Sequence, residues 1–281
     1  MTGAAEPEFD LLRERAAWMR EQIVGMAAQP VGAHLGGSLS ATDILSVLFF
    51  HVMRLRPEQP DWPDRDHFVL SKGHASAGLY AALAGRGFFD PEELSTYGHS
   101  GGRLAGHPLK RVPGVELSTG SLGHGLPLGV GLALAARRGG RPNRAFVLVG
   151  DGELQEGTIW EAAAAASALG LGNLVAIVDV NGWQMTGPTA PHGTSDRLAE
   201  KWSAFGWGTV TVDGHDLPQL VEALAGDRSS LEAPTVVLAR TVKGRGVSFI
   251  EDDARSHYVK LSPRLHQRAL ASLGAQDRVQ A

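Results

Sequence analysis

The chain of 281 residues contains no cysteine, which excludes disulfides, thiolate metal sites and cysteine nucleophiles. It also has no excess of basic residues: 26 lysines and arginines stand against 30 acidic residues, and the net charge is −4. We therefore expect no nucleic-acid partner. The sequence lacks an apolar run of about 18 residues, and its N-terminal segment lacks the apolar core of a signal peptide. We expect no membrane segment and a cytoplasmic location.

Hydrophobic residues make up 43% of the chain and charged residues 20%, as is typical of a globular protein with a sizeable core. Short apolar runs alternate with stretches of helical periodicity, which predicts an α/β fold with a parallel β-sheet sandwiched by helices. The expected strands are Phe68–Leu70, Ala145–Val149, Leu174–Val180, Gly208–Val212 and Thr235–Ala239. The expected helices are residues 8–28, 41–53, 74–85, 121–138, 157–169, 196–205 and 216–225.

The chain shows no linker and no change of composition, so we predict a single domain over residues 1–281. In a parallel sheet covered on both faces, ligands bind beyond the carboxyl ends of the strands. Residues 91–118 form a connection rich in glycine, histidine and proline. Connections of that length inside a compact domain are usually functional or disordered.

The segment "VLVGDGELQEG" places an acid, Asp151, between two glycines at the end of an expected strand. Glycines there let the backbone turn sharply and approach a ligand closely. For an isolated motif of this kind, the better interpretation is that Asp151 caps the helix that begins near Gly157. The next strand, however, ends in Asn181, thirty positions further on, which is about one strand–helix–strand unit. A carboxylate and an amide oxygen at adjacent strand ends suit Mg²⁺ or Ca²⁺, and such a metal often binds a substrate diphosphate.

Gly-Asp-Gly followed about thirty residues later by Asn resembles the signature of thiamine diphosphate enzymes. Five motifs resemble the N-terminal, diphosphate-binding half of transketolase, in the same order and over roughly residues 10–260: "LSKGHAS", "AGHP", "STGSLGHGLPLGVGLALA", "GDGELQEG" and "TVKGRGVSFIED". The resemblance implies a thiamine diphosphate-binding fold of the diphosphate-binding (PP) type, with thiamine diphosphate and Mg²⁺ or Ca²⁺ as cofactors.

The same resemblance implies roles for individual residues. Asp151, Asn181 and the main-chain carbonyl of Trp183 would hold the metal. Glu156 matches an acid that lies between subunits in this family and belongs to a proton relay. The implied cofactor-binding residues are His74, Gly120, Ser121, Leu122, Gly150, Asp151, Gly152, Glu153, Asn181 and Lys243.

Four of the 11 histidines stand at family positions, namely His34, His74, His107 and His257. Ketol transfer moves protons on and off hydroxyl groups near neutral pH, which histidine can do with little adjustment of its pKa. The nucleophile belongs to the cofactor. Three positions depart from the family pattern: His124 replaces a glutamine, Leu109 follows "HP" where an acid is common, and Tyr258-Val259 follows His257 where glycine is usual.

Transketolases also carry a pyrimidine-binding domain, with the glutamate that activates the cofactor, and a C-terminal domain. We expect both on a separate chain, a C-terminal transketolase subunit, with an α₂β₂ heterotetramer as the favoured assembly. The predicted function is that of the N-terminal subunit of a two-component transketolase, inactive alone. With its partner it would transfer a two-carbon ketol unit from a ketose or its phosphate to an aldose or its phosphate.

Two alternatives remain open at this point. One keeps the cofactor but passes the two-carbon unit to a carrier protein or lipoyl group, as in a 2-oxoacid dehydrogenase. The other is a regulatory module without activity, which the intact Asp151, Asn181 and Glu156 disfavour. Elsewhere, Asp216 in "VDGHD" is interpreted as a helix N-cap in place of a metal ligand. The alanine-rich residues 161–170 are expected at a subunit contact.

Overall fold

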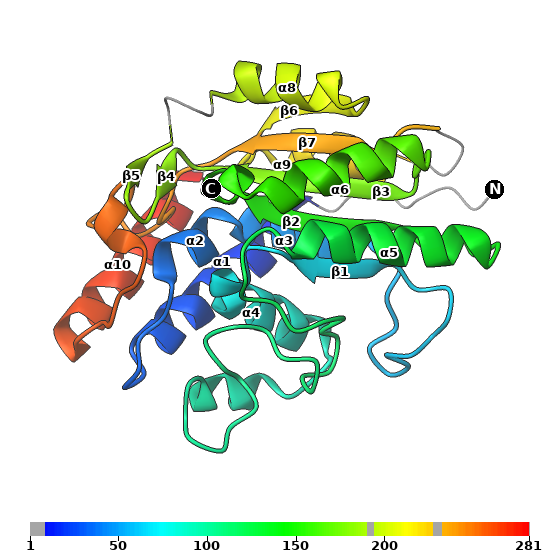
Figure 1. The fold of residues 1–281 in the computed structure, drawn as a ribbon. Coiled ribbons are helices and arrows are strands. Elements are labelled where there is room, and N and C mark those ends of the chain that lie inside the picture. The colour runs from blue at the N-terminus through cyan, green and yellow to red at the C-terminus, as the bar shows by residue number, and fades with distance from the viewer. Residues whose placement is uncertain (1–8, 190–193, 227–231, 281) are drawn as a thin grey trace.

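A computed structural model describes residues 9–189, 194–226 and 232–280, with the side chains of 276–280 left aside. Its centre is a five-stranded, fully parallel sheet in the order β1-β2-β3-β7-β6 (Figure 1). The strands are β1 (His67–Leu70), β2 (Ala145–Gly150), β3 (Leu174–Val180), β6 (Gly208–Asp213) and β7 (Thr235–Arg240). All five expected strands are confirmed to within one residue at each end. In β2, β3 and β7 the continuous apolar runs are buried on both sheet faces, whereas the edge strand β6 is mostly exposed.

Helices cover both faces of the sheet, and alternate strand residues point to each. Phe146 and Leu148 face one core with the helices of the N-terminal third and α9, while Val147 and Val149 face a second core with α5, α6 and α8. The first group is α1 (Phe9–Ala27), α2 (Leu35–Ser40), α3 (Thr42–Val47), α4 (Ser76–Arg86) and α9 (Leu217–Ala225). The second is α5 (Gly125–Arg138), α6 (Gly157–Ala168) and α8 (Ser195–Ala204).

Several elements differ from the sequence expectation. The helix expected over residues 41–53 is α3 followed directly by a short π-helical turn (Leu48–Val52). The helix expected from residue 121 begins only at Gly125. The helix α10 (Pro263–Gln280), which packs on α1, was not expected, nor was the small hairpin β4 (Trp183–Gln184) and β5 (Gly187–Pro188). Two-residue strands are too short to show a periodicity in the sequence. The remaining turns are 3₁₀ helices at Gly73–Ala75, Pro91–Thr96, Gly152–Gln155 and Ala254–Ser256.

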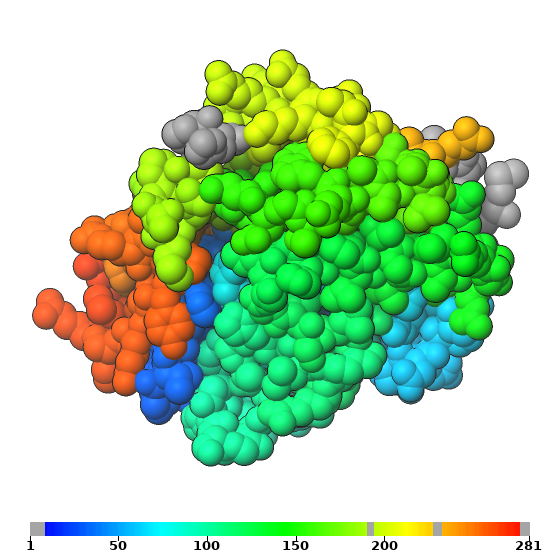
Figure 2. All heavy atoms as spheres, viewed as in Figure 1, coloured from blue at the N-terminus to red at the C-terminus, as the bar shows by residue number. Residues whose placement is uncertain are grey.

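The long connection over residues 91–118 is ordered, with one 3₁₀ helix at its start. Figure 1 shows it below the sheet, beside α4. Figure 2 shows a hollow where the hairpin, the segment before α10 and the green part of the chain meet. Among the helices of the described chain, none is long and apolar enough to cross a lipid bilayer.

Candidate functional site

A pocket of about 390 Å³ opens beyond the carboxyl ends of the strands. Segments that follow β1, β2, β3 and β7 all contribute to its wall, as expected for a parallel sheet. The register of the sheet explains why. Gly150, the last residue of β2, lies opposite Asp179 of β3, so the polar residues that follow these two strands lie side by side.

The Gly-Asp-Gly turn fixes the Asp151 carboxylate in this pocket. Its Oδ1 accepts from the Gly152 N–H at 2.9 Å, and its Oδ2 accepts from the Gly182 N–H at 2.8 Å and the Thr189 hydroxyl at 2.7 Å. Asp151 caps only the short 3₁₀ turn that follows, and α6 begins after Glu156 without a side-chain cap. The interpretation of Asp151 as the cap of α6 is therefore wrong.

The amide of Asn181 is oriented by a buried carboxylate on the strand before it. Its Nδ2 donates to Asp179 at 3.0 Å, and its Oδ1 accepts from the Trp183 N–H at 3.1 Å. Because a carboxylate can only accept here, the amide oxygen must face away from Asp179. Asp151, Asn181 and Trp183 all line the pocket, so the three predicted metal ligands lie together.

Asp179 itself holds the surrounding segments in place. It is fully buried and pairs with the equally buried Lys72, which also donates to the Gly37 carbonyl at 2.9 Å. Ser40 donates to the same carboxylate at 2.6 Å, and Thr241 adds a further hydrogen bond. Although burial acts against ionisation, the charge and hydrogen bond of Lys72 hold the pKa of Asp179 below its usual value.

The charges on the pocket wall are unbalanced. Burial raises the pKa of Asp151, and the nearby Asp179 carboxylate adds to that effect. Burial and the charge of Lys72 lower the pKa of Lys243 to about 8. A cation beside Asp151 would stabilise its negative charge, and an anion beside Lys72 and Lys243 would stabilise their positive charges.

The four predicted histidines form one cluster. The ring centroid of His34 lies 5.4 Å from that of His74, 5.6 Å from that of His107 and 5.4 Å from that of His257. Burial lowers the pKa of His34 and of His257 to about 4, helped by neighbouring positive groups, and the pKa of His74 lies well below its usual value for the same reasons. This differs from the expectation of little pKa adjustment. These three rings are therefore neutral at pH 7.

The segment after His257, where the sequence departs from the family pattern, is tied to the loop that carries His34. Val259 and Ala33 exchange two backbone hydrogen bonds of 2.9 Å each. The ring of Tyr258 packs edge-on against His34 at 4.9 Å between centroids, and its hydroxyl donates to the Val31 carbonyl. The substitution thus braces His34.

The predicted residues of the Gly120–Leu122 segment differ in where they lie. Gly120 and Leu122 line the pocket, whereas Ser121 is exposed and does not. A cofactor contact of Ser121 stays a prediction.

The two glutamates that follow the turn differ sharply. Glu153 is buried and accepts from Ser71 at 2.5 Å, from the Gly123 N–H at 2.9 Å and from the Gly150 N–H at 3.1 Å. It clamps the Gly120–Gly123 loop to the ends of β1 and β2. Glu156 is exposed at the rim, and its carboxylate makes no hydrogen bond or ion pair within the described part of the chain.

The donor set fits a hard cation and a phosphorylated cofactor. Across the residues that the structure describes, no group of three or more histidine or carboxylate side chains is placed to bind a metal. A cation here would rely on one carboxylate, one amide and a carbonyl, which suits Mg²⁺ or Ca²⁺ with water and phosphate completing the shell. A Cβ at Gly152 would lie 2.7 Å from the Gln184 Cβ, so only glycine permits this close turn. The buried Nδ1 of His34 has no partner among the described groups.

Comparison with known proteins identifies the family. Residues 16–276 match the family described as "Transketolase, thiamine diphosphate binding domain". The chain belongs to the transketolase family. It is 41% identical to the 6-deoxy-6-sulfo-D-fructose transketolase subunit of Clostridium sp. (strain MSTE9), over 96% of this chain and 98% of that protein. It is 43% identical to one of the apulose-4-phosphate transketolase subunits of Actinobacillus succinogenes, over 89% of this chain and 91% of that protein.

Solved transketolases share the fold. The Campylobacter jejuni transketolase superposes with a TM-score of 0.87 at 31% identity, over 94% of this chain but only 43% of that chain. The chain thus spans under half the length of the solved transketolase that it resembles. The expectations of a diphosphate-binding transketolase fold and of an N-terminal transketolase subunit that works with a partner chain are confirmed.

Sequence reasoning missed several members of the transketolase pocket. Lys72 and Gly37 line it, Gly37 accepts from Lys72, and Asp179 pairs with Lys72 from behind the pocket wall. The sequence could have indicated Lys72, because it lies in the quoted motif "LSKGHAS" two residues before His74. Asp179 lies within an apolar strand, and nothing in the sequence around it indicates a partner or a role. Gln155, Gln184, Met185 and Thr186 also line the pocket, the last three from the hairpin that was not expected.

Proposed function

We propose that the pocket binds thiamine diphosphate together with Mg²⁺ or Ca²⁺. Asp151, Asn181 and the Trp183 carbonyl would hold the cation, and Lys243 with the glycine turn at Gly152 would hold the diphosphate. The observation that carries the proposal is that one pocket brings together this oxygen donor set, two lysines and four histidines. Residues 1–281 would form one diphosphate-binding domain of this type.

Bound thiamine diphosphate supplies the carbon nucleophile for transfer of a two-carbon ketol unit. The part of this chain is to bind substrate hydroxyls and to move their protons. His34, His74 and His257 are neutral and would accept hydrogen bonds or protons from substrate hydroxyl groups, and Lys243 would supply positive charge against a developing alkoxide. His107 completes the ring of imidazoles around His34. These assignments support sugars or sugar phosphates as substrates.

The partner would be a C-terminal transketolase subunit that brings the pyrimidine-binding and C-terminal domains, in an α₂β₂ assembly. Two features support a contact near the pocket. Apolar residues are exposed on α5 and α6, with Leu128 of α5 37% exposed, Leu169 directly after α6 38% exposed, and Ala164 and Ala165 exposed on α6. Glu156 lies at the pocket rim with its carboxylate free to meet another chain. A cytoplasmic location stays a prediction.

The names of the relatives favour transfer from a ketose to an aldose over transfer to a carrier protein or lipoyl group. One is named for 6-deoxy-6-sulfo-D-fructose and the other for apulose 4-phosphate, both ketoses with an anionic group at the far end. We infer a ketose donor of this general class for this chain and an aldose or aldose phosphate as the acceptor.

Two measurements test the proposal. In the first, the purified chain is mixed with the matching C-terminal subunit, and ketol transfer is measured with thiamine diphosphate and Mg²⁺. Activity should require both chains, and robust transfer by this chain alone would refute the division of the enzyme into two subunits. Assays with sugar phosphates and with lipoylated carrier protein separate the proposed reaction from its alternative.

In the second, calorimetry follows thiamine diphosphate binding to the assembled pair with and without Mg²⁺. Asp151→Ala should abolish the metal-dependent part of the binding. Glu200→Ala removes an exposed acid of α8 that does not line the pocket and serves as the matched control. Unchanged binding in Asp151→Ala would remove the proposed metal site.

A further inference from the structure

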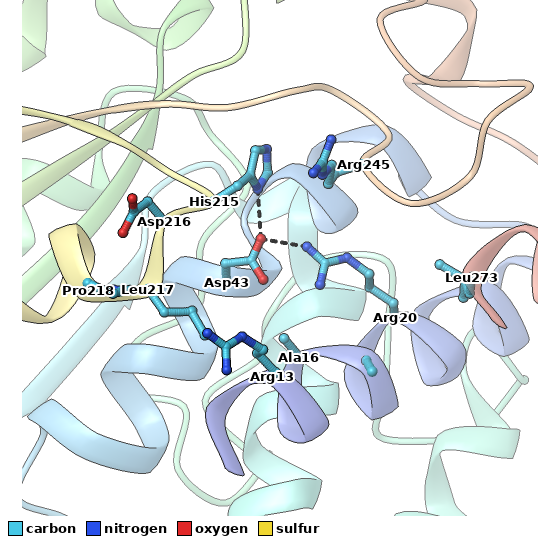
Figure 3. Close-up of a pocket in the computed structure, with 11 residues that line it drawn as sticks. Arg13, Ala16, Arg20, Asp43, His215, Asp216, Leu217, Pro218, Arg245 and Leu273 are labelled. Carbon is cyan, nitrogen blue, oxygen red and sulfur yellow. Dashed lines mark hydrogen bonds and ion pairs between the residues drawn. The ribbon is translucent and has the colours of Figure 1, made fainter. Parts of the chain in front are cut away.

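The pocket proposed to bind thiamine diphosphate is called the cofactor pocket below. A second pocket, called the arginine pocket, lies away from it, between α1, the start of α9, the loop after β7 and α10. Its volume is about 450 Å³, within the range of small-molecule sites. Figure 3 shows its wall, on which three arginines from two distant parts of the sequence gather. None of its residues lines the cofactor pocket.

Two of the arginines come from one face of α1. Arg13 and Arg20 are seven residues apart, which is two helical turns, so their side chains lie on the same side. Between them the helix presents Ala16 and Ala17, whose small side chains leave the space above the helix open. The third, Arg245, comes from the opposite wall, in the loop after β7.

A buried network fixes Arg20. Its Nη2 donates to Asp43 at 2.6 Å, and His215 donates from Nδ1 to the same carboxylate at 2.7 Å. The His215 Nε2 accepts from the Val242 N–H at 2.9 Å, which leaves the proton on Nδ1. Arg20 and Asp43 are 13% and 10% exposed at the side chain. The site is therefore preorganised.

Unused hydrogen-bond donors remain in this network. The Nε of Arg20 is buried and has no partner within the described residues. Arg245 is half-buried and makes no side-chain hydrogen bond or ion pair in the described part of the chain. Among the described residues, Arg13 pairs with the exposed Asp10, which does not line the pocket. The two carboxylates that do line it are engaged, Asp43 as above and Asp216 as the N-cap of α9.

We propose that this pocket binds a small phosphate-bearing molecule through Arg13, Arg20 and Arg245. Guanidinium groups match the oxygens of phosphate and donate to them in pairs. Donors on two opposite walls suit a tetrahedral anion better than a flat carboxylate, which one arginine fork can satisfy. The volume leaves room for an organic group on the phosphate.

The cofactor pocket would also attract phosphate, so the test must separate the two. The loop after β7 makes this feasible, because Lys243 lines the cofactor pocket while Arg245, two residues later, lines the arginine pocket. Inorganic phosphate is titrated onto the full chain at constant ionic strength, and binding is followed by calorimetry. Glycerol 3-phosphate, in a parallel titration, distinguishes a phosphate ester from free phosphate as the better ligand.

The variants Arg13→Ala and Arg245→Gln remove one guanidinium each from the arginine pocket. Each should weaken one class of phosphate sites by roughly tenfold or more, as expected for a lost charge-assisted hydrogen bond. Arg138→Ala, an exposed arginine at the end of α5 outside both pockets, is the control and should not change binding. Lys243→Ala should affect only phosphate in the cofactor pocket. Circular dichroism and thermal melts check that each variant is folded.

The proposal is overturned if folded Arg13→Ala and Arg245→Gln bind phosphate as the unaltered chain does. It is equally overturned if Lys243→Ala removes all saturable binding, since the anion would then occupy the cofactor pocket alone. Arg245→Lys adds a further check: it keeps the charge but loses the fork, so its affinity should fall between those of the unaltered chain and Arg245→Gln.

Discussion

The ion pair between Lys72 and Asp179 should be a main determinant of the stability of this domain. Its side chains are 1% and 0% exposed, and its carboxylate also accepts from Ser40, Thr241 and Asn181. Replacing Asp179 by asparagine preserves the shape but leaves the Lys72 ammonium buried without a counter-charge. Removing one partner of a buried pair costs about 3–5 kcal/mol.

This loss translates into a measurable shift of the melting temperature. The entropy of unfolding is about 2.1 cal/mol/K per residue, which gives about 0.6 kcal/mol/K for 281 residues. We therefore expect Asp179→Asn to lower the melting temperature by about 5–8 °C. Denaturant titration should report the same loss in the free energy of unfolding.

Two further variants make the test specific. Asp253→Asn breaks the pair of Asp253 with Arg255 on the surface and should leave the melting temperature unchanged. Lys72→Met combined with Asp179→Asn removes both buried charges and should cost less than the sum of the two single changes. If Asp179→Asn were no more destabilising than Asp253→Asn, the assignment of Asp179 as the anchor of the pocket would be refuted.

Three other perturbations address the pocket. The folded-state pKa of His257, about 4, lies below the usual histidine value, so its contribution to stability is present above about pH 6.5 and is lost as the pH falls toward 4. In denaturant titrations across this range, the free energy of unfolding of His257→Gln should depend less steeply on pH than that of the unaltered chain. An equal pH dependence would contradict the burial of His257. Gly152→Ala places a Cβ 2.7 Å from that of Gln184 and should lower the free energy of unfolding by about 1–3 kcal/mol. As the control, a Cβ at Gly157 meets no atom within 4 Å, so Gly157→Ala should leave the free energy of unfolding unchanged or raise it in the same titration. Glu156→Gln should lower turnover of the assembled pair without changing the melting temperature of this chain, and a loss of stability would show that the carboxylate acts within this chain.

The sheet and most of the predicted site were accessible from sequence for one physical reason. Continuous apolar runs identify the central strands, which are buried on both faces, and polar residues directly after such runs must lie at the ligand-binding edge. Asp151 and Asn181 satisfy this rule, and register places them together. The family motifs placed the histidines, which spacing alone could not, because His34, His74, His107 and His257 come from four separate loops whose packing is a tertiary property.

What the sequence missed are residues whose function depends on a partner far along the chain. Lys72 and Asp179 are separated by 107 positions, and a lone acid in an apolar strand gives no sign of the lysine that neutralises it. The same holds for Arg20, Asp43 and His215, which meet only after folding, with His215 172 positions from Asp43. Burying such charges is costly unless each finds its partner. The two buried networks therefore constrain the ends of β1, β3 and β7 to one arrangement, and the loop after β7 carries Lys243 into one pocket and Arg245 into the other.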